Sequence, residues 1–236
     1  PDGSPFMLDG RVGVLSAAGG TGKSWLVIQL AIAVACGGQW IEHYGCRKGR
    51  VLLALGEEKD EEIWRRVWRV AKHLRLSEYE RSEVARNLVP LGLDGEEVAF
   101  LHKSQDGNIT STPFFARLQQ ALSRDDWRLV VLDPLSYFGG PEVEGDPYVA
   151  TTLIRCGAKL TKSPGGPAVL FSAHSRKKQQ GFGNKLDSDD TRESSAIVDG
   201  SRWVCSVGKR SEAITSLQVT NTNYNLAGDE VLLARG

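Results

Sequence analysis

The sequence predicts an α/β fold in which a mostly parallel central sheet is flanked by helices, with antiparallel strands at its C-terminal end. Two observations carry this prediction. Short apolar segments with the length of buried strands alternate with helical segments, which is the pattern of a parallel sheet covered on both faces. After residue 200 the helical segments stop and three strand-like segments follow. We expect one domain over residues 1–236, with residues 1–6 as a terminal tail.

The parallel part of the sheet is predicted from four apolar runs, at residues 12–15, 51–55, 129–132 and 168–172. We expect the strand at 51–55 to lie beside the strand at 12–15. The closing strands are predicted at residues 202–207, 214–220 and 230–233, antiparallel to one another.

Helices are predicted at residues 24–35, 60–76, 113–122 and 148–161. The first is apolar on nearly all sides, as a helix at the centre of a sheet requires, and the second has its apolar residues on one face. Pro113 stands at the first helical position, where its missing N–H costs nothing. Ser77 and Glu80 have the spacing of a capping box, which indicates a further short helix.

The composition excludes several classes of protein. The 29 basic and 29 acidic residues cancel, so a basic surface for nucleic acid would have to be local. The four cysteines are scattered without a C-x-x-C pair, which disfavours zinc and indicates a reduced, cytoplasmic protein. The longest apolar stretch, residues 25–36, is interrupted by Gln29 and is shorter than the roughly 20 residues that span a bilayer. The first residues do not resemble a signal peptide, and we expect no membrane partner.

A glycine-rich loop between the first strand and the first helix is typical of a phosphate-binding P-loop. Its glycines let several backbone N–H groups point at a polyphosphate, and the helix N-terminus adds to the attraction. Lys23 would lie between the β- and γ-phosphates, and the Ser24 hydroxyl would bind Mg²⁺. Ala17 stands at the first motif position, where glycine is usual. The residues predicted to hold ATP are Ala18, Gly19, Gly20, Thr21, Gly22, Lys23 and Ser24. The alternative is a glycine-rich turn with an accidental Lys-Ser.

Two acidic positions at strand ends complete the predicted chemistry. Asp133 closes the run at 129–132, where an aspartate can reach the metal shell, although many strands end in aspartate. Glu57 and Glu58 follow the strand at 51–55, and a carboxylate there can activate the attacking water. We choose Glu57, with Glu58 in reserve. The alternative is an acidic helix N-terminus that the helix dipole favours.

These motifs resemble a known family. The glycine loop, the Glu57-Glu58 pair, Asp133 and the segment 171–174 are similar to the RecA-like P-loop NTPase core of hexameric replicative helicases, and most of all to the plasmid-encoded RepA helicases. The resemblance runs from about residue 7 to 224, and the segment 194–203 is its most distinctive landmark. It implies a RecA-like fold, ATP hydrolysis with Mg²⁺ and a homo-oligomer, expected to be a hexameric ring.

The resemblance also assigns three further residues. His174 would sense the γ-phosphate, and Arg202 and Arg66 would complete the site of the neighbouring subunit. An arginine supplied in trans stabilises charge on the transferred phosphoryl group. The alternatives are a partly buried structural histidine, a surface arginine beside Trp203 for Arg202, and a helix arginine paired with Glu62 for Arg66.

A basic segment follows His174 and is predicted to form a mobile loop over residues 175–194. In a ring it would face the central channel and bind single-stranded nucleic acid, expected to be DNA. Its predicted contacts are Arg176, Lys177, Lys178, Phe182 and Lys185. The acidic residues that follow would weaken the field, and the alternative is a solvated loop without a nucleic-acid partner.

Two functions therefore remain from different classes. The first is a helicase-like motor on nucleic acid, driven by ATP hydrolysis. The second is an oligomeric regulatory or binding module that ATP switches, without unwinding. Asn221 stands where the resembling helicases carry a lysine, which makes ATP hydrolysis a firmer expectation than unwinding.

Overall fold

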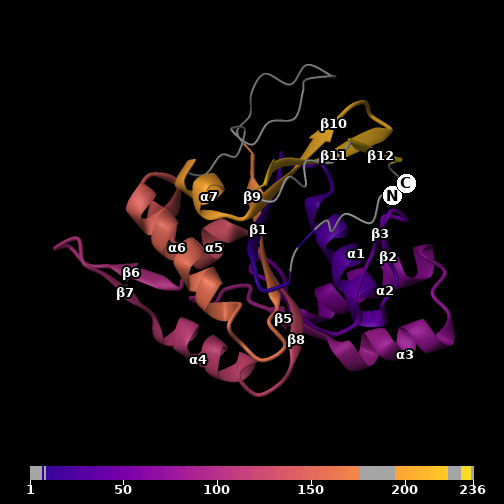
Figure 1. Ribbon diagram of the computed structural model, residues 1–236, viewed down its shortest axis with the longest axis horizontal. Helices are drawn as coiled ribbons and strands as arrows, with labels where there is room; N and C mark the ends of the chain where they lie inside the picture. Colours follow the sequence, from indigo (N-terminus) through magenta and orange to yellow (C-terminus); the bar gives the residue numbers. More distant parts are fainter. Residues whose placement is uncertain (1–6, 8, 176–194, 223–229, 235–236) are drawn as a thin grey trace.

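The structure is a computed structural model that describes residues 7, 9–175, 195–222 and 230–234. An eight-stranded sheet runs through its centre in the order β12-β11-β10-β1-β9-β8-β4-β5 (Figure 1). The strands from β10 to β5 are parallel, whereas β10, β11 and β12 are antiparallel to one another. The eight strands are β1 (Val12–Ala17), β4 (Arg50–Leu55), β5 (Leu88–Gly92), β8 (Trp127–Asp133), β9 (Ala168–His174), β10 (Trp203–Lys209), β11 (Ile214–Thr222) and β12 (Val231–Ala234). The predicted fold class is confirmed.

Helices cover both faces of this sheet (Figure 1). One face carries α1 (Lys23–Cys36), α2 (Asp60–His73) and α3 (Glu78–Asn87), and the other carries α4 (Pro113–Leu122), α5 (Leu135–Gly139) and α6 (Pro147–Leu160). A 3-10 turn, η1 (Pro141–Glu144), precedes α6, and α7 (Ser195–Gly200) packs against α6. β1 shows how the two cores divide, because Leu15 and Ala17 face the first core while Val12 and Val14 face the second.

The predicted position of β4 was wrong. It does not lie beside β1, because β9 and β8 stand between them. Parallel strands are joined by long crossovers, so adjacency in the chain does not fix adjacency in the sheet. β5 was not predicted at all, since Pro90 and Gly92 disfavour a strand. It forms an edge of the sheet, where proline is tolerated.

The local signals for helix ends were reliable. Ser77 and Glu80 form the predicted capping box, and the Thr112 side chain accepts a hydrogen bond from Phe115 N at the start of α4. α2 ends at His73, three residues before its predicted end, and Arg75 adopts a left-handed φ of 53° just beyond it. Two small hairpins, β2–β3 (Gln39–Trp40, Tyr44–Gly45) and β6–β7 (Leu101–Lys103, Ile109–Ser111), were not predicted.

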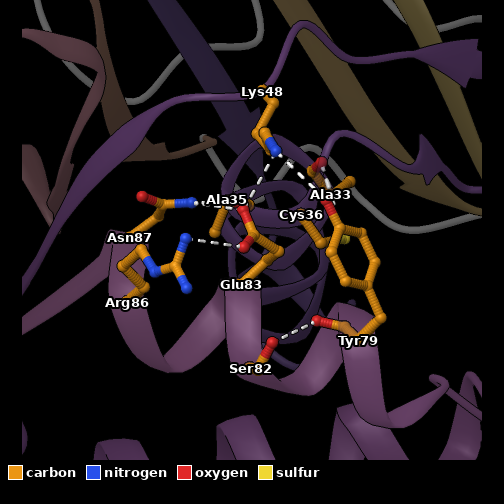
Figure 2. Close-up of polar contacts among 9 residues, drawn as sticks. All are labelled: Ala33, Ala35, Cys36, Lys48, Tyr79, Ser82, Glu83, Arg86 and Asn87. Carbon is orange, nitrogen blue, oxygen red and sulfur yellow. Dashed lines mark hydrogen bonds and ion pairs between the residues drawn. The ribbon is translucent and has the colours of Figure 1, made fainter.

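A polar cluster locks α3 onto the C-terminal end of α1 (Figure 2). Glu83 is buried and forms ion pairs with Lys48 Nζ at 3.0 Å and with Arg86 Nη1 at 3.1 Å. Asn87 Nδ2 donates a hydrogen bond of 2.8 Å to Ala35 O, one of the carbonyls that a helix end leaves without a partner. The hydrogen bond from Lys48 lowers the pKa of Glu83. The cluster therefore fixes the helix whose other end forms the P-loop.

Some expectations fall on residues that the structure does not describe. The terminal tail, residues 1–6, lies outside the described residues, as do residues 176–194 of the predicted basic loop. Within the described part of the chain, no helix combines the length and the apolar character needed to cross a membrane.

Candidate nucleotide site

The P-loop occupies the turn from β1 into α1. Gly20 and Gly22 adopt left-handed φ values of 74° and 92°, which favour glycine. A Cβ atom added to either glycine, or to Gly19, would meet nothing within 4 Å, so the loop is open on that side. Thr21 Oγ1 donates a hydrogen bond of 2.7 Å to Ala18 O and holds the turn closed. Ala17 is the last residue of β1 and extended, which explains why alanine is tolerated there.

Lys23, Ser24 and Asp133 meet at the start of α1. Lys23 Nζ lies 3.3 Å from Asp133 Oδ1, and Ser24 Oγ donates a hydrogen bond of 3.2 Å to Asp133 Oδ2. Lys23 Nζ is buried and makes no hydrogen bond in the described part of the chain. A buried ammonium with spare donors beside an open backbone loop fits a polyphosphate.

Ser172 supports this group and was not assigned a role from the sequence. It is fully buried in β9, and its Oγ donates a short hydrogen bond to Asp133 Oδ1. The aspartate is therefore held from both sides, by Ser24 and by Ser172. The signal in the sequence was a hydroxyl in an otherwise apolar strand, two residues before His174.

Glu57 and Glu58 differ in what they bind. Gly56 N donates a hydrogen bond of 2.7 Å to Asp133 O, so both glutamates follow directly on a residue that is tied to the predicted metal ligand. Glu58 Oε1 lies 2.5 Å from Arg66 Nη2. Glu57 is exposed and makes no hydrogen bond or ion pair with the residues that the structure describes. Its carboxylate is therefore the one of the two that is available to a water molecule.

Arg66 is held within its own chain. Besides Glu58 it contacts Glu62 through Nε at 3.0 Å, the pair that the sequence offered as an alternative to a role in catalysis. This hydrogen bond lowers the pKa of Glu62. The guanidinium also lies 5.9 Å from the ring centroid of Trp25, which follows Ser24 in α1. Arg66 thus links α2 to the P-loop helix.

His174 and Arg202 lie at opposite edges of the sheet. The register of β1 and β9 pairs Ala17 with His174, so the half-buried histidine stands beside the start of the P-loop. Arg202 precedes β10, which runs parallel to β1, and its N–H donates to Val12 O at the other end of β1. The exposed Arg202 is therefore not part of the P-loop site of its own chain.

The described residues contain no group of three or more His, Cys, Asp and Glu side chains placed to hold a metal ion. A metal in this site would thus depend on Ser24, Asp133 and the phosphate oxygens of the nucleotide, which suits Mg²⁺. The predicted nucleic-acid contacts, Arg176, Lys177, Lys178, Phe182 and Lys185, lie outside the described residues.

Comparison with known proteins agrees with this geometry. Residues 3–180 match the model of a family described as an AAA domain. The chain belongs to this AAA domain family. Its fold is similar to that of a solved structure, the ATPase domain of a helicase, with a TM-score of 0.62. The two are 14% identical, and the match covers 96% of this chain and 82% of the other. The AAA domain protein is thus an ATP-binding P-loop ATPase domain with a RecA-like fold.

Proposed function

We propose that this AAA domain protein hydrolyses ATP with Mg²⁺ at an interface between identical subunits and uses the energy to move on single-stranded nucleic acid. The observation that carries the proposal is the convergence of Lys23, Ser24 and Asp133 at the P-loop. Glu57 adds a carboxylate that is unpaired among the described residues. Positioning and electrostatic stabilisation are the main tasks in phosphoryl transfer, and these residues are suited to both.

Each residue has a separate task in the proposed reaction, in which ATP and water give ADP and phosphate. Lys23 and the backbone N–H groups of the loop bind the β- and γ-phosphates, and Glu57 accepts a proton from the attacking water. His174, beside Ala17, responds to the loss of the γ-phosphate. Mg²⁺, held by Ser24 and Asp133, would neutralise charge on the phosphate oxygens.

The position of Arg202 favours a shared site. In one chain it lies at the edge of the sheet away from the P-loop, so it can act only on the nucleotide of a neighbouring chain. A heterologous contact of this kind closes into a ring when the rotation between subunits allows it. A ring, expected to be hexameric, would complete the site. Arg66 is a weaker candidate for this role because Glu58 and Glu62 already bind it.

Nucleic acid enters the proposal through the basic segment after β9. β9 ends at His174, so Arg176, Lys177 and Lys178 follow the predicted γ-phosphate sensor closely. Nucleotide state and strand binding would thus be coupled through neighbouring residues. Phe182 and Lys185 would add stacking and charge.

The test is ATP turnover with and without single-stranded DNA, in wild type and in the triple variant Arg176→Gln, Lys177→Gln, Lys178→Gln. We expect DNA to stimulate wild-type turnover, and the triple variant to keep basal turnover but lose the stimulation. The triple variant Arg81→Gln, Arg86→Gln, Arg124→Gln is the matched control for net charge. Turnover that DNA does not change, together with assembly that requires ATP, would instead favour the regulatory module.

A further inference from the structure

A cavity lies at the amino ends of the parallel strands, at the edge of the sheet opposite the P-loop. Its volume is about 490 Å³, within the range of about 300–1,000 Å³ of pockets that hold small organic ligands. Leu129 and Ala168 line it from the starts of β8 and β9, and Leu30 and Val34 line it from the second half of α1. The proposed ATPase reaction uses none of these residues.

One wall of the cavity is aromatic and fixed. Trp40 and Tyr44 belong to the β2–β3 hairpin, and their ring centroids lie 6.1 Å apart. Trp40 Nε1 donates a hydrogen bond of 3.0 Å to Leu26 O in α1, so the indole ring cannot turn away. Together with the aliphatic residues, this wall suits the apolar body of a ligand.

The mouth of the cavity selects an anion. Arg47 and Arg128 come from different elements, yet the Nη1 atom of each lies 3.0 Å from the same oxygen, Asp9 Oδ2. Arg11 also lines the cavity, so three arginines face one carboxylate. Burial raises the pKa of the Cys46 thiol to about 11, so this lining residue adds no negative charge at neutral pH. Guanidinium groups that already converge on a carboxylate oxygen are arranged for such a group.

We propose that this cavity binds a small organic anion, with an aromatic or aliphatic body between Trp40, Tyr44 and the α1 side chains and a carboxylate or sulfonate head on Arg47 and Arg128. The Asp9 carboxylate shows where the head group binds, because it already lies between the two arginines. This inference is independent of the proposed motor function, since the cavity and the nucleotide site lie at opposite edges of the sheet.

The competing interpretation is that the two ion pairs only anchor the segment before β1. A titration of the full chain with the aromatic anion 8-anilinonaphthalene-1-sulfonate, followed by its fluorescence, separates the two. We expect saturable one-to-one binding. The double variant Arg47→Gln, Arg128→Gln should bind at least about tenfold more weakly, since each arginine contributes a charge-assisted contact. The matched variant Arg81→Gln, Arg124→Gln has the same net charge and should bind like wild type.

A second variant and a second measurement guard against misfolding. The Arg47 side chain is 79% exposed, so Arg47→Gln alone should leave the melting temperature unchanged while weakening the probe at least about fivefold. Methyl NMR resonances of Leu30, Val34 and Leu129 should shift as the probe binds. Equal binding by the cavity variants and the matched control, binding without saturation, or unshifted methyl resonances would overturn the proposal.

Discussion

Arg66 Nη2 lies 2.5 Å from Glu58 Oε1, and this ion pair separates two glutamates that are adjacent in the sequence. Glu57 is left exposed and unpaired among the described residues, so Glu57 rather than Glu58 is the candidate for water activation. Glu57→Gln should therefore bind ATP normally but lose turnover by at least about a hundredfold, the lower end of what a positioned base contributes. Glu58→Gln should stay within about threefold of wild type, because Arg66 keeps Glu62. Phosphate-release kinetics check both variants, and an inactive Glu58→Gln beside an active Glu57→Gln would reverse the assignment.

Lys23→Ala should lose nucleotide binding. The ammonium is buried and has donors to spare for phosphate oxygens, and loss of a buried charged partner costs at least about thirtyfold in affinity. Isothermal titration with ATP measures this directly, with Lys162→Ala, an exposed lysine on the opposite side of the sheet, as control. ATP affinity equal in the two variants would mean that the loop is a turn without a role in phosphate binding.

Arg202→Ala should bind ATP almost normally but turn it over slowly, by about a thousandfold if the arginine acts fully in trans. Mixing this variant with Lys23→Ala creates some interfaces that keep both groups, so activity should recover in the mixture. Arg124→Ala is the control for loss of an exposed arginine. A mixture as inactive as its parts would exclude a shared site that depends on Arg202.

Glu83→Gln should destabilise the protein in a pH-dependent manner. Lys48 lowers the pKa of Glu83 in the folded state, so the stabilisation is present above the pKa of an unfolded glutamate, about 4.3, and is lost as the pH falls through the lower folded value. At pH 7 the variant should melt about 2–4 °C below wild type, a small loss for a chain of this size. The difference should shrink as the pH falls below about 4. A difference that stays constant across this range would contradict a charged role for Glu83 in the cluster of Figure 2.

The sequence was informative where function depends on neighbours in the chain. The P-loop, the Ser77 capping box, the start of α4 and the strand ends at Asp133 and His174 are all set by local chemistry. It was uninformative where contacts join distant segments. The separation of β4 from β1, the hydrogen bond from Ser172 to Asp133 and the pairing of Arg66 with Glu58 depend on how the strands and helices pack. The edge strand β5 escaped because Pro90 conceals it.

The cavity at the opposite edge illustrates the same limit. Asp9, Arg47 and Arg128 are far apart in the sequence, and no motif connects them. Only the packing of the segment before β1 against the β2–β3 hairpin and β8 brings their charges together. A site of this kind cannot be recognised before the strand order is known.

The central claim is that Lys23, Ser24, Asp133 and Glu57 form one Mg²⁺-dependent site for ATP hydrolysis. Its most direct test is phosphate release measured across a Mg²⁺ titration in wild type and Asp133→Asn. We expect turnover that EDTA abolishes, and a variant that needs a Mg²⁺ concentration at least about tenfold higher, because an amide in place of the carboxylate lacks the charge that attracts the ion. Turnover without Mg²⁺, or an identical Mg²⁺ requirement in the two proteins, would contradict the claim.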